Sequence, residues 1–185
     1  MWLPGLEEYL STKTPFGEQT MFEQIRALPP ASTVIVDDAS GMRIFGRTPA
    51  VVDLAPADAR AAAAELDRRL AGAVESLVHA DVPVCAITSG GLDSSYVTAL
   101  ATRVLDDVDT FNIAYTGRWP ADERHFAQEV AVRLRTRHHQ VEIDPATFPE
   151  LIPDVVWHLG QPNADPVTLS TLALFRAVKQ AGFKV

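Results

Sequence analysis

Cysteine is nearly absent from this sequence of 185 residues, and the single one is Cys85. One thiol excludes an internal disulfide framework and any metal site built from several cysteines. Basic residues are also sparse, because 16 lysines and arginines stand against 24 aspartates and glutamates, which gives a net charge of −8. This balance argues against a surface for nucleic acid or an anionic membrane, since phosphate neutralisation needs clustered basic side chains.

Long apolar runs are missing as well. No segment approaches the roughly 20 apolar residues that a membrane helix needs. The first residues also lack the basic segment and apolar core of a secretory signal, so we expect a cytoplasmic protein without a membrane partner. What remains is ordinary globular composition, 47% hydrophobic and 22% charged, in a chain long enough for one main domain with a sizeable core.

The first fifty or so residues are rich in proline and turn residues, and we expect them to form a loop-rich end piece. Within it, residues 32–36 and 42–45 are short apolar runs on either side of a turn, a pattern that predicts a β-hairpin. Residues 49–56 have the composition of a linker. The sequence therefore predicts one part over residues 1–52 and a second part over residues 53–185.

From residue 82 onward, short apolar segments alternate with amphipathic ones, which is typical of βαβ units and a parallel sheet. The expected strands cover residues 84–88, 110–115 and 140–143. The expected helices include 58–80, where Asp58 is the N-cap, and 126–134, 148–159 and 166–181. The predicted fold class is α/β with a doubly wound parallel sheet, preceded by the short hairpin.

The segment Ser-Gly-Gly-Leu-Asp-Ser-Ser at residues 89–95 follows the first of these strands and leads into a helix. Such a junction points backbone N–H groups and the positive end of a helix dipole at one spot, which favours an anion. The two glycines let the backbone approach phosphate oxygens, and the serine hydroxyls add hydrogen bonds. Asp93 would repel a bare phosphate, so it implies a cation such as Mg²⁺ between carboxylate and phosphate.

Neither the lysine nor the spacing of a Walker A loop is present, so kinase and GTPase chemistry is not indicated. Release of pyrophosphate, with AMP transferred to a carboxylate, fits the segment better. A plain strand-to-helix turn with a capped helix is the structural alternative. It is disfavoured because such a turn does not need two glycines, three hydroxyls and an acid together.

Other reactive side chains have simpler explanations. Cys85 lies in an apolar strand, which favours packing over nucleophilic chemistry. His138 and His139 are adjacent on a strand and face opposite sides, so a metal pair is disfavoured. Asp122 and Glu123 have the positions of a helix start.

One further acid lies in a loop expected near the ligand crevice. Asp165 precedes Pro166 and fits a helix cap, and a contribution to a substrate pocket stays open for this loop.

Residues 89–95 resemble the pyrophosphate motif of the N-type ATP pyrophosphatases, whose fold is of the adenine nucleotide alpha hydrolase-like kind. The segments 81–84, 109–113, 136–141 and 156–166 resemble, more narrowly, the glutamine-hydrolysing asparagine synthetases. Residues 20–30 are similar to the close of that family's glutaminase domain. By this resemblance the ATP-binding residues are Thr88, Ser89, Gly90, Gly91, Leu92, Asp93, Ser94, Ser95 and Ile113, with Asp93 also directed to Mg²⁺.

The resemblance implies that ATP activates aspartate as β-aspartyl-AMP with loss of pyrophosphate, and that ammonia from glutamine then displaces AMP to give asparagine. The expected ligands are ATP, Mg²⁺, aspartate and glutamine or ammonia, with a homodimer as one possible assembly. Two alternatives stay open. One is a natural-product amide synthetase of the β-lactam or lasso-peptide kind, and the other is a non-catalytic ATP-binding module.

The sequence departs from the family pattern at both ends. Trp2 follows Met1 where the family's glutaminase has a cysteine, and the family's glycine-rich acidic loop would lie beyond Val185. We therefore expect an internal fragment, with residues 1–52 as the end of a glutaminase-like domain plus linker. Residues 53–185 would be the N-terminal part of the ATP-binding domain, with the catalytic residues beyond Val185, and the fragment alone is expected to be inactive.

Overall fold

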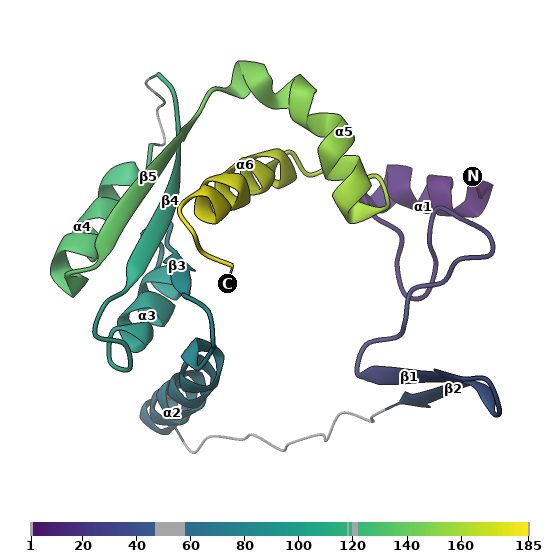
Figure 1. Ribbon diagram of the computed structural model, residues 1–185, viewed down its shortest axis with the longest axis horizontal. Coiled ribbons are helices and arrows are strands. Elements are labelled where there is room, and N and C mark those ends of the chain that lie inside the picture. Colours follow the sequence, from purple (N-terminus) through teal and green to yellow (C-terminus); the bar gives the residue numbers. More distant parts are fainter. Residues whose placement is uncertain (1, 47–57, 118, 120–121, 185) are drawn as a thin grey trace. The chain divides into compact units, whose positions relative to one another are not determined.

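The computed structural model describes residues 2–46, 58–117, 119 and 122–184 (Figure 1). Two compact units are present. The first comprises Met1–Ala55 and Pro153–Pro166, and the second comprises Pro56–Ile152 and Val167–Val185. The linker predicted over residues 49–56 lies outside the described residues.

A parallel sheet forms the centre of the second unit. Its strands, in the order in which they pair, are β3 (Cys85–Ile87), β4 (Asp109–Tyr115) and β5 (Arg137–Ile143). This confirms the predicted parallel sheet. The strand β5 begins earlier than expected, at Arg137, because its first residues continue the ladder with the start of β4.

Helices cover both faces of this sheet. The helices α3 (Leu92–Ala101) and α4 (Arg124–Leu134) connect consecutive strands, and α6 (Val167–Gln180) packs on β4 and β5. Figure 1 shows α4 and α6 on opposite sides of the strands, as the predicted doubly wound arrangement requires. The fold class is therefore α/β, with the sheet between helical layers.

The helix α2 (Ala59–Val78) begins where the sequence predicts, because the Asp58 side chain accepts a hydrogen bond of 2.7 Å from the backbone N–H of Ala61. This bond satisfies one of the N–H groups that a helix leaves free at its start. Its apolar face then packs against α3. There, Val74 joins a buried cluster with Leu100 of α3 and Val108.

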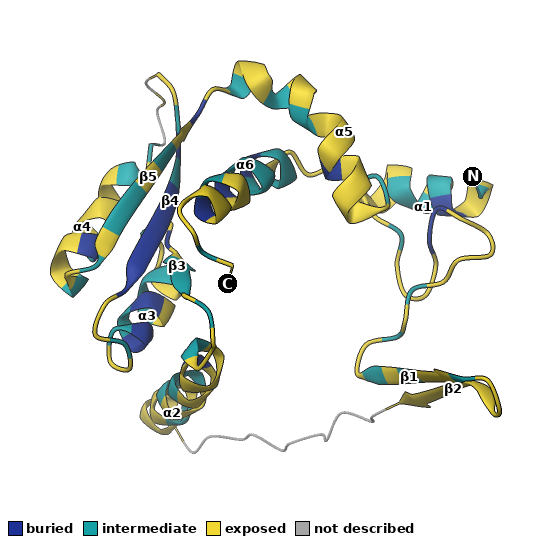
Figure 2. Cartoon of the chain, in the orientation of Figure 1, coloured by how far each residue is buried: buried dark blue, intermediate teal, exposed yellow. Residues whose placement is uncertain are grey.

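A second cluster lies between the sheet and α6. Phe111 of β4, which is 2% exposed, packs with Leu174 and Val178 of α6. The strand β4 is buried along most of its length, as Figure 2 shows in dark blue, because strands and helices surround it on every side. Central parallel strands are typically buried in this way. The strand predicted over residues 110–115 agrees with β4.

The first unit contains an antiparallel hairpin and a helix. The hairpin pairs β1 (Ser32–Asp37) with β2 (Gly41–Gly46), which confirms the prediction. The helix α1 (Leu3–Thr12) corrects the expectation of a loop-rich end piece for these residues. Its Pro4 occupies the first turn, where a missing N–H costs nothing, and Gly5 lies so close to Thr20 that a Cβ would stand 2.6 Å from its carbonyl oxygen.

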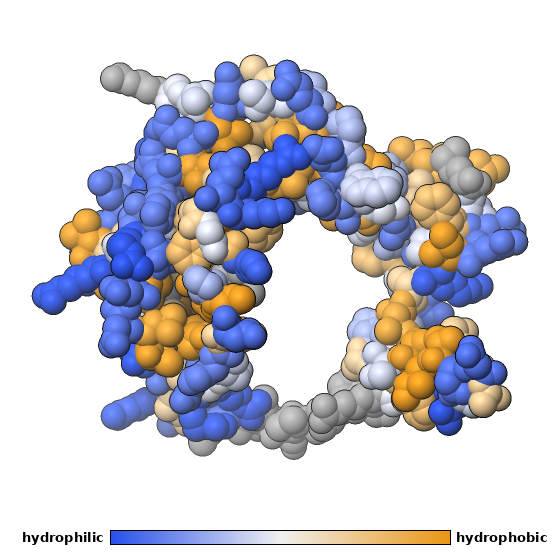
Figure 3. Space-filling model, viewed as in Figure 1, coloured by the Kyte–Doolittle hydropathy of each residue, from blue (hydrophilic) through white to orange (hydrophobic). Residues whose placement is uncertain are grey.

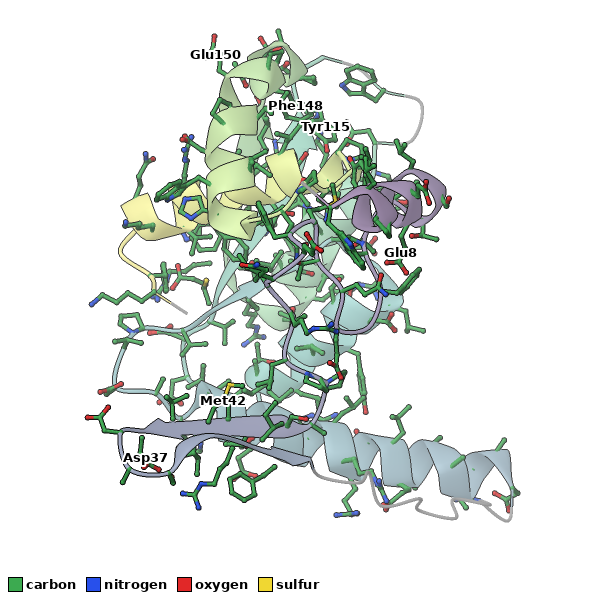
Figure 4. The ribbon with its side chains drawn as sticks, turned by 90° about the vertical axis from the view of Figure 1, so that its right-hand side faces the viewer. Glu8, Asp37, Met42, Tyr115, Phe148 and Glu150 are labelled. Carbon is green, nitrogen blue, oxygen red and sulfur yellow. The ribbon has the colours of Figure 1, made fainter. Side chains whose placement is uncertain are left out.

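The hairpin carries apolar side chains at its surface. Val36 is 72% exposed and Met42 is 68% exposed, and Figure 3 shows hydrophobic residues gathered on this hairpin. Figure 4 labels Met42 on the same two strands as Asp37. These side chains therefore belong to neither of the two cores of the second unit.

The remaining helix, α5 (Phe148–Leu159), follows a short 3₁₀ turn at Pro145–Thr147 and has the bounds that its apolar periodicity predicts. Within the described ranges, no helix combines the length and apolar character that crossing a membrane requires.

Candidate functional site

The loop between β3 and α3 is shaped by one glycine that no other residue can replace. Gly90 has a φ of +81°, and a Cβ there would lie 2.4 Å from the backbone nitrogen of Ala127 and 2.5 Å from the carbonyl carbon of Phe126. Both of these atoms belong to the backbone of α4, which cannot move aside as a flexible side chain can. The loop backbone is thus pressed against α4, a close approach that only glycine permits.

The start of α3 is open to a ligand. Gly91 is the N-cap residue and provides no side-chain cap, so no cap side chain occupies the first N–H groups of the helix. Asp93 lies in the first helical turn and is exposed, and Leu92 is 86% exposed. These N–H groups and the helix dipole together favour an anion at this position.

Two serine hydroxyls hold the loop in shape. The backbone N–H of Ser89 donates to Oγ of Ser94 at 3.1 Å, and the two hydroxyl oxygens are 3.0 Å apart. The N–H of Gly91 donates to Oγ of Ser89 at 3.3 Å. The hydroxyl of Ser95 differs, since it is buried without a partner among the described residues. Ser89 and Ser94 are therefore the hydroxyls that belong to the loop itself.

Thr88, the residue before the loop, is fully buried. Its N–H donates to the carbonyl oxygen of Phe111 at 2.9 Å, and its own carbonyl oxygen accepts a bond of 3.1 Å from Nδ2 of Asn112. The Thr88 hydroxyl has no partner among the described side chains and backbone groups. The structure thus places the backbone of Thr88 at the base of the loop and its side chain in the interior.

A pocket of about 170 Å³ lies beside the loop, at the carboxyl end of β4. It brings together Ser89 and Ile113, two residues that the sequence assigned to ATP. Its lining consists of Ser89, Asn112, Ile113, Ala114, Tyr115, Trp119, Asp122, Glu123 and Arg124. Ligands in open parallel sheets bind at this edge. Proximity to the carboxyl end of a predicted strand was therefore the sequence signal that could have identified Trp119 and Arg124, whereas Asn112 lies in the middle of that strand.

An ion-pair network forms the rim of this pocket. Arg124 donates to Asp122 at 2.7 Å, to Glu142 at 3.1 Å and to the carbonyl oxygen of Tyr115 at 2.7 Å. The hydrogen bond from Arg124 holds the pKa of Asp122 below its usual value. Glu123 is the N-cap residue of α4, which confirms the predicted helix start. It also lines the pocket. Each of the three guanidinium nitrogens has a partner, so Arg124 links three groups of the rim.

Tyr115 anchors the end of β4. Its hydroxyl is 2.7 Å from Oγ of Ser170 on α6, and its ring meets Phe148 edge-on with centroids 6.2 Å apart. Figure 4 shows the Tyr115 and Phe148 side chains next to each other. The Tyr115 side chain at the end of β4 is thus held by both α6 and α5.

Metal binding can be assessed from the donor set. No cluster of three histidine, cysteine or acidic side chains with suitable geometry occurs in the part of the chain that the structure describes. Asp93 is exposed beside the open helix start, with no protein partner within the described ranges. One carboxylate that shares a cation with phosphate oxygens is a donor set that Mg²⁺ accepts. The residues present therefore fit Mg²⁺ delivered together with a phosphate ligand.

The amino end of the same sheet has a different character. Arg137 donates hydrogen bonds to both carboxylate oxygens of Asp109, the shortest at 2.7 Å, and Nε2 of His139 lies 2.7 Å from the same carboxylate. The His139 ring stacks on Phe111, and Nδ1 of His138 is 3.1 Å from the Thr110 hydroxyl. Both histidines thus have the structural role that the sequence favoured.

Cys85 begins β3 at the same end of the sheet. The residue is half-buried, and its burial raises the pKa of the thiol, which agrees with packing and not with nucleophilic chemistry.

Comparison with known proteins gives matches over most of the second unit. The family model described as asparagine synthase matches residues 65–185. Glutamine-hydrolyzing asparagine synthetase 1 of Bacillus subtilis is 30% identical over 104 residues, which cover 56% of this chain and 16% of that protein. Amidase chyE of Penicillium rubens is 30% identical over 132 residues, which cover 64% of this chain and 20% of that protein.

Among solved structures, the NH3-dependent NAD synthetase from Campylobacter jejuni aligns with a TM-score of 0.42 and 16% identity, over 63% of this chain and 52% of that one. The aligned part of this chain spans about a fifth or less of the length of the two curated relatives.

Proposed function

Because the chain belongs to the asparagine synthase family, we propose that it contributes the nucleotide site of an ATP-dependent, amide-forming ligase. The carboxylic acid that this ligase activates is aspartate. Its β-carboxylate attacks the α-phosphorus of ATP, which forms β-aspartyl-AMP and releases pyrophosphate. Ammonia, drawn from glutamine, then displaces AMP and leaves asparagine. The observation that carries this proposal is the loop at residues 89–95, where Gly90 is pressed against α4 and the start of α3 is open beside a pocket.

In this proposal the loop holds the phosphates that leave. The N–H groups at the start of α3 and the hydroxyls of Ser89 and Ser94 donate to the phosphate oxygens, and hydrogen bonds between these two serines shape the loop. Preorganised donors of this kind stabilise charge as it develops on a leaving group. Asp93 would hold Mg²⁺, which when bound supplies neutralisation of pyrophosphate charge.

The pocket at the end of β4 would receive the remainder of the nucleotide. Ile113 offers an apolar surface there, and the Trp119 ring lines the same pocket with its Nε1 bonded to the carbonyl oxygen of Thr116 at 2.9 Å. Because that indole N–H is already satisfied, the ring presents its face and edge to a ligand without a polar penalty. Ser89 lies in both the loop and the pocket lining, which supports one continuous ligand across the two.

The test is an assay of AMP and pyrophosphate in the full-length protein, with ATP, Mg²⁺ and one candidate acid at a time. Aspartate should trigger equal amounts of AMP and pyrophosphate, and ammonia or glutamine should convert the acid to its amide. Formation of ADP and phosphate, or no nucleotide cleavage with aspartate, would contradict the proposal. The active protein is proposed to be cytoplasmic, and its mass in solution would show whether it is a homodimer.

A second candidate differs only in the acid. This candidate is a natural-product amide synthetase, and a relative named as an amidase, at the same 30% identity as the asparagine synthetase, supports amide chemistry on an acyl group other than aspartate. A panel of carboxylic acids in the same assay separates the two candidates, because only the second predicts pyrophosphate release with an acid other than aspartate. Nucleotide binding without any cleavage would instead indicate a non-catalytic ATP-binding module.

A further inference from the structure

Asn112 links the middle strand of the sheet to the base of the loop. It lies on β4 and is 5% exposed, and its Nδ2 donates the 3.1 Å bond to the carbonyl oxygen of Thr88. Rotating the carboxamide by 180° would place its oxygen against that carbonyl oxygen, so only the observed orientation makes a hydrogen bond. The amide Oδ1 is then left buried without a partner among the described residues.

The peptide between Thr88 and Ser89 is held at both of its polar atoms. Its carbonyl oxygen accepts from Asn112, and its N–H donates to Oγ of Ser94 at 3.1 Å. This peptide is the point where the strand ends and the loop begins. The orientation of this peptide therefore determines the positions of two hydroxyl groups. The first belongs to Ser89, and the second belongs to Ser94 and accepts the hydrogen bond from the peptide N–H.

We propose that Asn112 is a positioning residue for the loop: by holding the carbonyl oxygen of Thr88, it orients the hydroxyls of Ser89 and Ser94 toward a bound phosphate. The inference rests on the proposed function, because it needs the loop to bind the phosphates of a nucleotide. A carbonyl released from Asn112 could rotate and turn its negative end toward the loop, which would repel the anion. Among the described residues, Nδ2 is the polar atom of the carboxamide that has a partner, so the bond to the Thr88 carbonyl oxygen is the contact that the proposal rests on.

Two variants of the full-length protein test the inference, Asn112→Leu and Asn112→Asp, with ATP, pyrophosphate and adenosine as probes. The first variant removes the donor while keeping the volume. We expect it to weaken ATP and pyrophosphate about tenfold, on the scale of one lost hydrogen bond plus an unpaired carbonyl. Adenosine should be weakened less, because Asn112 also lines the pocket but the loop does not bind adenosine. A merely structural role would weaken adenosine and pyrophosphate equally.

The second variant adds a readout that depends on pH. The carboxylate introduced by N112D cannot donate to Thr88 and repels phosphate, so binding at pH 8 should be poorer than for N112L. Burial raises the pKa of such a carboxyl group. At about pH 5.5 a protonated carboxyl can donate the missing bond, and pyrophosphate affinity relative to wild type at the same pH should recover.

Thr110→Val is the matched control. Thr110 is buried on the same face of β4, and its hydroxyl bonds to Thr136 and His138, away from the loop. This variant should lower the melting temperature without changing pyrophosphate affinity. Wild-type affinity in N112L, or equal losses for pyrophosphate and adenosine, would overturn the inference while the proposed function stands. A wild-type protein that binds neither ATP nor pyrophosphate would overturn both.

Discussion

The two ends of the sheet in the second unit share the same strands but use their polar groups in opposite ways. At the amino end, Asp109 is shared by Arg137 and His139, so its charge is satisfied within the protein. At the carboxyl end, the start of α3 has no side-chain cap, and Oδ1 of Asn112 has no partner among the described residues. Under the proposed function, the amino end stabilises the fold, whereas the carboxyl end receives the nucleotide.

One buried nitrogen at the amino end of the sheet also lacks a hydrogen-bond partner among the described residues. At the amino end, Nε2 of His138 is buried without a partner in the described part of the chain, and burial lowers the pKa of this ring. A neutral ring needs no counter-charge, so this nitrogen leaves an unmade hydrogen bond but no charged site. The comparison therefore predicts that substitutions at the carboxyl end alter ligand binding, whereas substitutions at the amino end alter the free energy of unfolding.

Gly90→Ala should have the largest effect of any single change at the carboxyl end. The added Cβ collides with the α4 backbone at a residue with a positive φ, so we expect about 3 kcal/mol of lost stability and loss of ATP binding by about 100-fold. Urea unfolding and calorimetry would measure the two effects. Gly72→Ala is the control, because Gly72 lies in α2 with nothing within 4 Å of its Cβ position. A G90A protein that binds ATP normally would contradict the assigned loop geometry.

Asp109→Asn should have the largest effect at the amino end, and on stability alone. The change weakens the bonds from Arg137 and His139 to a side chain that is 10% exposed, and we expect a loss of about 2 kcal/mol. Affinity of the folded protein for ATP should not change. Reduced ATP affinity in folded D109N would break the separation between the two ends.

The same carboxylate gives a pH dependence. Hydrogen bonds from Arg137, with the contact from His139, hold the pKa of Asp109 below its usual value. Because the folded pKa lies below the unfolded one, the stabilisation is complete well above pH 4 and is lost as the pH falls through the lowered folded pKa. The stability difference between wild type and D109N, measured by urea unfolding, should therefore shrink from pH 7 to pH 3. A difference that grows in acid would have the wrong sign for this account.

Asp93→Asn should affect binding without affecting stability. Asp93 is exposed, so the melting temperature should stay the same, while ATP affinity in saturating Mg²⁺ should fall about tenfold through loss of one cation ligand. Asp106→Asn serves as the control, since Asp106 is an exposed acid in the turn after α3. Equal ATP affinity in D93N and wild type at every Mg²⁺ concentration would rule out the proposed metal role.

The smallest effect is expected at Ser95. Its hydroxyl is buried and unpaired within the described ranges, so Ser95→Ala should change stability by less than about 0.5 kcal/mol and leave ATP affinity unaltered. Ser94→Ala removes a hydroxyl that bonds to the loop backbone and should weaken ATP about fivefold. The ratio of the two ATP dissociation constants checks this difference. Equal losses of ATP affinity in the Ser95→Ala and Ser94→Ala variants would mean that the Ser95 hydroxyl also contributes to ATP binding.

Local patterns were enough to predict the frame of the fold. Alternation of apolar runs located the strands of the sheet, and Asp58 marked the start of α2 because capping depends on neighbours in sequence. The helix α1 was missed because Pro4 and Gly5 read as helix breakers. The contact of Gly5 with Thr20 that accounts for the glycine joins residues fifteen positions apart, and no local pattern shows it.

The loop could be predicted for the same reason as the strands, since its glycines, serines and acid are consecutive. The pocket could not. Asn112 and Arg124 line the pocket with Ser89 only because β4 lies beside β3 and because α4 starts next to the loop. Such placement is a property of tertiary packing, so it was available only as a general expectation for the ends of parallel strands.

Hydrogen–deuterium exchange of the full-length protein, with and without ATP and Mg²⁺, tests the contrast between the two ends most directly. The account predicts that ligand slows exchange in peptides covering residues 89–95 and 112–117, and leaves peptides confined to residues 102–109 and 136–140 as they were. Protection confined to the amino end, or no protection of residues 89–95 under saturating ATP, would contradict it.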